Sequence, residues 1–241
     1  MKFDAWYLSD KGLRRDSNQD SCLINKDLGL FIVADGMGGH SGGEVASSIA
    51  VETVQNIFKG VEGQKNDPRE TLSKAYQTAS QKIYDKAANE SPELAGMGTT
   101  MVVACADEKT MYIGNVGDSR CYLFNKPYLW QITEDHSLVN EQLRAGLLTE
   151  EQSKSFVGRN VITRSVGYER EVRPDILERQ IEPGEIYLIC SDGLSGLVTD
   201  EKISQILCNN PPEKMAKACV EQALANGGDD NVTVLIIHFR K

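Results

Sequence analysis

The sequence lacks the cysteine patterns that mark zinc sites and disulfide frameworks. Its six cysteines form no Cys-x-x-Cys or Cys-His spacing, and several lie in apolar runs, as reduced, buried thiols of a cytoplasmic protein do. The first ten residues contain no signal-peptide apolar core, and no apolar run approaches the length that spans a membrane. We therefore expect a cytoplasmic protein with no membrane partner.

Clustered positive charge is also missing. The 26 Lys and Arg residues against 35 Asp and Glu residues give a formal net charge of −9, and without a basic patch we expect no nucleic-acid partner. No Gly-x-x-x-x-Gly-Lys-Ser/Thr motif is present, and no lysine follows the glycine-rich segment, which argues against a nucleotide-binding loop. The sequence has no repeat, low-complexity segment or linker. Its 241 residues therefore suit one domain, residues 1–241, with a large core.

Two apolar runs in the sequence end in the same dipeptide. Leu30–Ala34 is followed by Asp35-Gly36 and a glycine-rich segment around His40, and Ile186–Ser191 is followed by Asp192-Gly193. Such runs, bounded by turn signals, predict strands buried on both faces. Either Asp-Gly alone could be a hairpin turn, for which it is the commonest dipeptide. Two buried strands that each deliver an aspartate to a strand end suggest instead that two halves of the fold converge on one cation site.

The remaining pattern predicts an α+β fold of two stacked, mainly antiparallel sheets flanked by helices. Strands over 99–132 are expected to form one antiparallel meander, and the polar segment 137–164 is expected to be an inserted cover. Helices are predicted over 45–58, 68–89, 138–145, 149–155, 200–207 and 212–225, and the other strands over 5–8, 22–24, 176–180 and 232–239.

Five aspartates lie in predicted turns at strand ends: Asp20, Asp35, Asp118, Asp192 and Asp230. Each has a structural alternative, because aspartate stabilises turns and caps helices. Together, with no His or Cys cluster, they describe an all-oxygen site for hard cations such as Mg²⁺ or Mn²⁺. Paired hard metals are suited to phosphate ester hydrolysis, and a nearby arginine would bind the phosphoryl group.

Seven separated motifs resemble the metal-dependent Ser/Thr protein phosphatases of type 2C, in the order seen in the compact bacterial branch of that family. The resemblance covers nearly the whole chain and implies a four-layer α-β-β-α sandwich. The motifs are Arg15-x-x-Asn18-Gln19-Asp20, Asp35-Gly36-Met37-Gly38-Gly39-His40, Gly98-Thr99-Thr100, Gly114-Asn115-Val116-Gly117-Asp118-Ser119-Arg120, Asp135-His136-Ser137, Ser191-Asp192-Gly193 and Gly228-Asp229-Asp230-Asn231-Val232-Thr233.

The resemblance implies metal-dependent hydrolysis of phosphoserine and phosphothreonine in proteins by metal-activated water, with two core Mn²⁺ or Mg²⁺ ions and a weaker third. It also implies a counterpart Ser/Thr kinase and a monomeric enzyme. The metal ligands carried over are Asp35 as the bridging carboxylate, Gly36 through its carbonyl, Asp192 and Asp230 at the first ion, Asp20 near the second through water, and Asp118 at the third.

Other roles follow from the same resemblance. Arg15 matches the phosphate-binding arginine, with Arg14 as the alternative if the register is off by one. Animal relatives carry a histidine directly after Asp-Gly, where this chain has Met37, so His40 is taken as the general acid, with a structural loop role as the alternative. His136 is expected to order the base of the cover.

The cover resembles the flap of the family, but Phe156-Val157 stand where bacterial relatives often have His-Pro shortly before Arg-Asn. Three alternatives remain beside a protein phosphatase. The same site could hydrolyse small phosphate esters, and the chain could be an inactive regulatory module or, more weakly supported, a nucleotide binder. For Asp118 the alternative is a purely structural salt bridge with Arg120.

Overall fold

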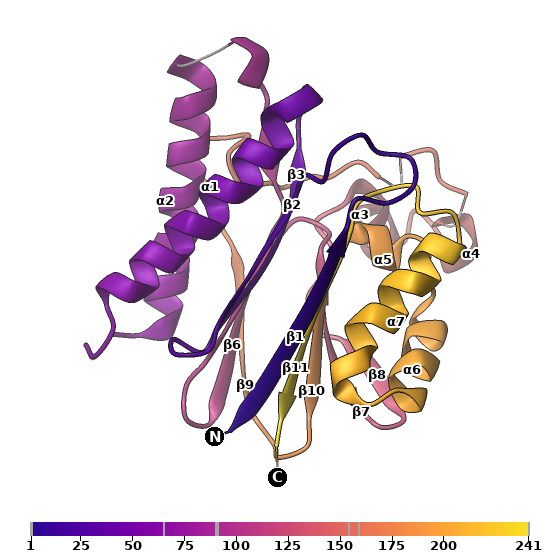
Figure 1. Ribbon diagram of the computed structural model, residues 1–241. Coiled ribbons are helices and arrows are strands. Elements are labelled where there is room, and N and C mark those ends of the chain that lie inside the picture. Colours follow the sequence, from indigo (N-terminus) through magenta and orange to yellow (C-terminus); the bar gives the residue numbers. More distant parts are fainter. Residues whose placement is uncertain (1, 65, 90–91, 154, 159, 241) are drawn as a thin grey trace.

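Two antiparallel β-sheets make up the centre of the structure, which is a computed structural model describing residues 2–64, 66–89, 92–153, 155–158 and 160–240 (Figure 1). In these residues one sheet has the order β1 (Phe3–Asp10), β11 (Val232–Phe239), β10 (Ile186–Cys190), β7 (Arg120–Asn125), β8 (Tyr128–Gln131). The other has the order β2 (Asp20–Asn25), β3 (Leu30–Met37), β5 (Met101–Ala106), β6 (Thr110–Val116), β9 (Asp175–Gln180), with β4 (Gly98–Thr99) paired to β3.

Helices cover the outer faces of both sheets. In Figure 1, α1 (Gly39–Gly60) and α2 (Pro68–Asn89) lie on the sheet that contains β3, and α6 (Asp200–Asn209) and α7 (Pro212–Ala225) lie on the opposite side, next to β10 and β11. The predicted α+β sandwich with four layers, helix, sheet, sheet and helix, is confirmed. The shorter helical segments are η1 (Pro92–Leu94), α3 (Leu138–Arg144), α4 (Glu150–Ser153) and α5 (Asp192–Ser195).

Strand β3 is buried on both faces, as its unbroken apolar run predicts. Leu30, Ile32 and Ala34 pack into the cluster under α1 and α2, whereas Phe31 and Val33 pack between the sheets, because successive side chains point to opposite faces of a strand.

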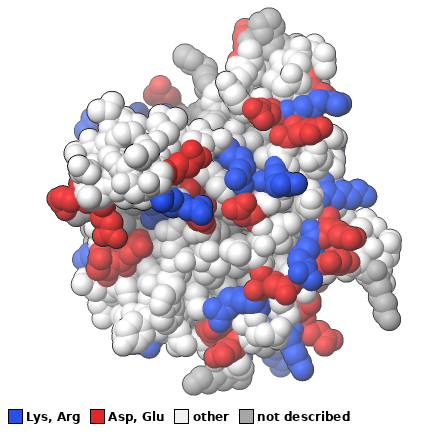
Figure 2. All heavy atoms as spheres, turned by 180° about the vertical axis from the view of Figure 1, so that it is seen from behind, with Lys and Arg blue, Asp and Glu red and all other residues white. Residues whose placement is uncertain are grey.

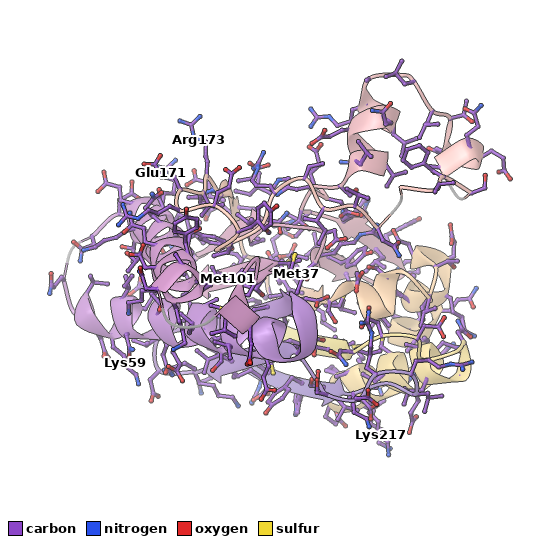
Figure 3. All side chains as sticks on the ribbon, turned by 90° about the horizontal axis from the view of Figure 1, so that it is seen from above. Met37, Lys59, Met101, Glu171, Arg173 and Lys217 are labelled. Atoms are coloured by element: carbon purple, nitrogen blue, oxygen red, sulfur yellow. The ribbon has the colours of Figure 1, made fainter. Side chains whose placement is uncertain are left out.

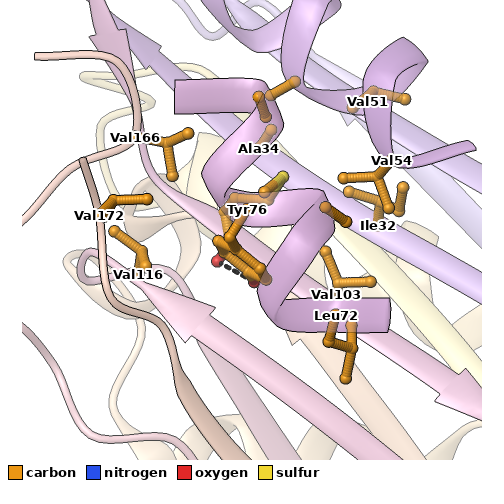
Figure 4. Close-up of a cluster of buried hydrophobic side chains, with 14 of the residues drawn as sticks. Ile32, Ala34, Val51, Val54, Leu72, Tyr76, Val103, Val116, Val166 and Val172 are labelled. Carbon is orange, nitrogen blue, oxygen red and sulfur yellow. Dashed lines mark hydrogen bonds between the residues drawn. The ribbon is translucent and has the colours of Figure 1, made fainter. Parts of the chain in front are cut away.

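The cluster under α1 and α2 also encloses a buried aromatic side chain (Figure 4). Tyr76 of α2 is fully buried, and its hydroxyl donates to the carbonyl of Met101 at 2.9 Å. Gly114 on β6 leaves the room for this ring, since a Cβ there would lie 2.7 Å from a Tyr76 ring carbon. This packing fixes α2 against the sheet that carries β3.

The predicted single meander over residues 99–132 is wrong. Strands β5 and β6 pair in the sheet of β3, but β7 and β8 belong to the sheet of β10. The chain crosses between the sheets at Gly117, whose φ of 104° is open to glycine and strained for other residues. The apolar periodicity could not reveal this crossing. Strands β6 and β7 are both mostly buried, so the pattern of apolar and polar residues does not change where the chain passes from one sheet to the other.

On the face shown in Figure 2, basic and acidic side chains are interspersed over the surface. Across the described residues, no helix has both the length and the apolar character needed to cross a membrane.

Candidate active site

Asp20 and Asp35 meet because of strand register. Strands β2 and β3 pair antiparallel with Asp20 directly opposite Asp35. Thr100 fixes the backbone of Asp35 from the other side: its Oγ1 accepts the Asp35 N–H at 3.1 Å, and its own N–H donates to the Asp35 carbonyl at 2.8 Å. Two carboxylates are therefore held on neighbouring strand ends, where each disfavours ionisation of the other.

Asp192 and Asp230 come from the other sheet. Helix α5 begins at Asp192, immediately after β10, and Asp230 lies in the turn that leads into the neighbouring β11. Gly193 lets these two turns touch, because a Cβ on it would lie only 2.0 Å from the carbonyl oxygen of the residue after Asp230. Gly36 has the same reason to be glycine, since a Cβ there would lie 2.0 Å from the Gly43 carbonyl oxygen. Both Asp-Gly pairs thus serve close backbone approach, and the hairpin alternative does not apply.

Asp20 connects the two sheets directly. Its Oδ2 accepts hydrogen bonds from the hydroxyl of Ser191 at 2.8 Å and from the hydroxyl of Thr233 at 2.6 Å. Ser191 follows β10 and Thr233 belongs to β11, so the carboxylate of one sheet is held by hydroxyls of the other. The second oxygen, Oδ1, is buried with no hydrogen-bond partner among the described residues. One oxygen of this carboxylate therefore joins the two sheets, and the other is left without a partner among the described residues.

Asp118 lies in the turn after β6, which His136 holds in place. The N–H of Gly117 donates to His136 Nδ1 at 3.0 Å, and the N–H of His136 donates to the Gly117 carbonyl at 2.9 Å. Arg120 makes its hydrogen bonds to Asp135, at 2.6 to 3.0 Å, and to a tyrosine hydroxyl. The salt bridge between Arg120 and Asp118 that offered a structural alternative is not formed in the described residues.

The electrostatics of the site disfavour ionised carboxylates. Burial raises the pKa of Asp118 to about 7 and that of Asp20 to about 6, with the charge of Asp192 adding to both. Burial and then the charges of the surrounding aspartates raise the pKa of Asp35 well above its ordinary value, and burial followed by the charge of Asp230 raises that of Asp192. A bound cation would reverse this, because positive charge stabilises the ionised form of each carboxylate.

The unpaired oxygens fit a hard divalent cation. Oδ1 of Asp20, Asp118 and Asp192 is in each case buried without a hydrogen-bond partner in the described part of the chain, a costly state unless a ligand is bound. Among the described residues, no three His, Cys, Asp or Glu side chains are arranged to hold a metal by themselves. Ions here would need further oxygen ligands, such as the Gly36 carbonyl and water, which Mg²⁺ and Mn²⁺ readily keep.

A cavity of about 430 Å³ is lined by Asp35, Asp192 and Asp230 but not by Asp20 or Asp118, and Arg15 is the basic residue among the described residues that line it. The Arg15 Nη2 lies 2.6 Å from Asp230 Oδ2, and this hydrogen bond raises the pKa of the guanidinium further. Arg14 points elsewhere: it pairs with Asp229 at 3.8 Å, and both side chains are largely exposed. The geometry therefore favours Arg15 over Arg14 as the residue that meets a phosphate.

The structure describes the side chain of His136 but not that of His40. His40 belongs to the first turn of α1, but its side chain lies outside the described part of the structure. Met37, at the position after Asp-Gly, lines the cavity. His136 is buried and engaged, with Nε2 at 3.1 Å from Asp175, and its carbonyl accepts the Thr163 N–H at 2.9 Å. As predicted, it orders the base of the cover.

Sequence reasoning assigned no role to several residues that complete the site. Asn231 organises the loop that carries Arg15: its Nδ2 donates to the carbonyls of Lys11 and Ser17, and its Oδ1 accepts the N–H of Gln19. Its place directly after Asp230 was the available signal. The other cavity residues without an assigned role were Gln19, Gly38, Thr100, Asn160 and Ile162.

The predicted cover borders the cavity through the last residues of its chain, at 160–162. Asn160 and Ile162 line the cavity, and Ile162 forms a β-bridge with Ser137 at the start of the segment. Phe156 packs against Gly158, where a Cβ would lie 2.8 Å from the ring, while Val157 is fully exposed. The dipeptide that differs from bacterial relatives therefore stands on the outer part of the cover.

Known proteins similar to this chain are consistent with the site. The sequence model of the family described as Protein phosphatase 2C matches residues 13–225. The serine/threonine phosphatase stp of Listeria monocytogenes is 36% identical over 239 residues, 97% of this chain and 94% of that protein.

Two solved structures show the same architecture. The serine/threonine phosphatase PstP/Ppp of Mycobacterium tuberculosis superposes with a TM-score of 0.92 at 34% identity, covering 99% of both chains. A structure of the catalytic domain of PstP in complex with two manganese ions has a TM-score of 0.89 at 33% identity, again covering 99% of both chains. Because both the family match and these relatives span almost the entire sequence, the chain belongs to the protein phosphatase 2C family.

Proposed function

We propose that this chain, a protein serine/threonine phosphatase by family, hydrolyses phosphoserine and phosphothreonine in proteins within the cavity beside Asp35, using Mn²⁺ or Mg²⁺. One observation carries the proposal. Asp35, Asp192 and Asp230 line one cavity together with the guanidinium of Arg15, and Oδ1 of Asp192 is buried without a hydrogen-bond partner among the described residues. This combination suits a dianionic phosphate held between metal and arginine. Binding of two manganese ions by the similar PstP domain supports the choice of metal.

We assign the metal ligands to oxygens of both sheets. When bound, the ions would supply hydroxide at neutral pH and stabilise the attacking and leaving oxygens. Two core ions would be held by Asp35, the Gly36 carbonyl, Asp192 and Asp230, with Asp20 acting through water, and Asp118 would hold a weaker third ion.

The residues of the chain itself have separate tasks. Arg15 would bind the phosphate oxygens in its bidentate fork, and its partner Asp230 keeps the guanidinium beside the cavity before substrate arrives. Met37 contributes an apolar wall and no proton donor. We propose His40, in the first turn of α1, as the acid that protonates the leaving serine or threonine oxygen. The pH profile of turnover in a His40→Gln variant tests that role, because loss of a general acid removes the alkaline limb of the profile.

We further propose that residues 1–241 form one catalytic domain whose flap is the segment of about 137–164. A Ser/Thr kinase would be its counterpart, since only such an enzyme makes the substrate. The six cysteines carry free thiols, the state expected in the cytoplasm, where we place a monomeric enzyme.

Turnover of one generic phosphothreonine peptide with Mn²⁺, compared with a sugar phosphate, tests the proposal. We expect the peptide to be hydrolysed faster and the reaction to stop when EDTA removes the metal. Preference for the sugar phosphate would indicate a phosphatase of small esters. Tight Mn²⁺ binding without turnover of either compound would indicate a regulatory module.

A further inference from the structure

A second and larger cavity adjoins the active-site cavity. It measures about 580 Å³ and shares the side chains of Met37, Asn160 and Ile162 with the active-site cavity. The two cavities therefore adjoin at these three residues. The new cavity is otherwise lined by eight residues between 163 and 173, at the end of the cover and directly after it in the chain. We call this cavity the side pocket.

The wall of the side pocket is fixed to the metal-binding part of the fold. The Nη1 of Arg164 donates to Asp175 Oδ1 at 2.7 Å and to the carbonyl of Arg173 at 3.2 Å. The other oxygen of Asp175 contacts His136, which holds the turn of Asp118. Charge on Arg164 is therefore already compensated by Asp175, and the wall is ordered before any ligand arrives.

The remaining charges of the side pocket favour a cation. Glu169 and Glu171 line it, both are exposed, and neither forms an ion pair with another described residue. Arg173 also lines the side pocket without pairing with either of these described carboxylates, and in Figure 3 it lies beside Glu171, with Met37 nearer the centre of the view. Tyr168 adds an aromatic ring that is 65% exposed, and an exposed ring face attracts a guanidinium or ammonium group.

We infer that the side pocket binds the residues next to the phosphorylated residue of a polypeptide substrate, and that it selects a basic side chain there. The inference rests on the proposed function, because the position of the side pocket next to the phosphate cavity is what brings a neighbouring substrate side chain to it. A polypeptide suits it better than a small ester, since only a chain that continues beyond the phosphorylated residue reaches residues 168–171 from the cavity of Arg15.

Peptides that differ only next to phosphothreonine test the inference. Each carries arginine, alanine or glutamate at the two positions before or the two positions after the phosphothreonine, and kcat/KM is measured with Mn²⁺. For the wild type we expect arginine to exceed alanine by about two- to fivefold on one side, as one or two exposed ion pairs provide, and glutamate to fall below alanine. The preference should shrink at high salt.

The double variant Glu169→Gln/Glu171→Gln should lose the arginine preference, so that the ratio of arginine to alanine peptides approaches one. The matched control is Glu62→Gln, the same change at an exposed residue beyond the end of α1, which should keep the wild-type ratio. Because each enzyme is compared with itself, altered folding or metal content cancels.

Hydrolysis of p-nitrophenyl phosphate by the wild type separates the two proposals. Turnover of that ester without any peptide preference, or a preference that survives in the double variant, overturns the side-pocket inference alone. Failure to hydrolyse either the ester or the peptides with Mn²⁺ overturns the proposed function and the inference with it.

Discussion

The stability of the metal-free protein should fall as the pH rises from 5 to 8. The pKa of Asp118 is raised to about 7 and that of Asp20 to about 6, so the folded state binds more protons than the unfolded chain over this interval. A carboxyl with a raised folded pKa stabilises the fold fully below its unfolded pKa near 4 and loses that contribution as the pH rises through the folded pKa. Asp4 and Asp175, whose pKa values are lowered, change the stability only at pH values below this interval.

Asp118 and Asp20 set a lower bound on the magnitude, because Asp35 and Asp192, whose pKa values are also raised, add to the loss. Between pH 5 and the folded pKa there are two units for Asp118 and one for Asp20, and at 1.36 kcal/mol per unit the loss is about 4 kcal/mol. For a chain of this length it corresponds to a decrease in Tm of about 8 °C. The loss should largely disappear with saturating Mn²⁺, which compensates the carboxylates in the folded state.

The assay is denaturant unfolding of EDTA-treated protein at pH 5 and pH 8, followed by circular dichroism. Asp118→Asn serves as the internal control, because it removes the two-unit share of Asp118 and should reduce the pH dependence by about 3 kcal/mol. Equal or greater stability of the metal-free wild type at pH 8 would refute the reasoning. So would an unchanged pH dependence in the variant.

Three further predictions concern single residues of the site. Asp35→Asn and Asp192→Asn should each abolish phosphopeptide turnover while circular dichroism and Tm show an intact fold, since the change is nearly isosteric; wild-type-like turnover in either would contradict the two-metal site. Arg15→Ala should raise KM by about 10- to 100-fold through loss of a charge-assisted contact worth ~1.5–3 kcal/mol, while the Mn²⁺ affinity measured by calorimetry is retained. A larger increase in KM for Arg14→Ala would show that Arg14, and not Arg15, matches the phosphate-binding arginine of the family. Asp118→Ala should keep two tightly bound Mn²⁺ ions in calorimetry but lose most turnover, and full activity with unchanged stoichiometry would reduce Asp118 to a turn residue.

The secondary structure could be predicted where local signals are strong. Helix α2 begins at Pro68 and ends at Asn89 as expected, because proline favours a first helical turn and the apolar spacing is helical. Helix α1 begins at Gly39, six residues before the predicted start, because its glycine-rich first turns have poor helix propensity. The close packing of Gly36 and Gly43 fixes them nonetheless. The start of α1 is therefore set by tertiary contact and not by local sequence.

The convergence of the five aspartates could be inferred only from their shared position at strand ends. The pairing of Asp20 with Asp35 follows from strand register, which the unbroken apolar run of β3 leaves undetermined because it does not alternate. The approach of Asp192 to Asp230 depends on β10 pairing with β11, more than 40 residues apart in the chain. The side pocket was out of reach for the same reason, since Met37 and residues 163–173 share no local pattern.

The arrangement of the first and last strands has a consequence for synthesis on the ribosome. Strand β1 pairs with β11, and the hydroxyl of Thr233 in β11 holds the carboxylate of Asp20. A nascent chain emerges from its N-terminus, and Asp20 precedes its partner Thr233 by 213 residues. A product interrupted before Val232 lacks a strand from the middle of one sheet and leaves Asp20 without one of its two hydroxyl partners. The order of synthesis therefore places the pairing of β1 with β11, and the Thr233 hydrogen bond that holds Asp20, after the other described strands have been made.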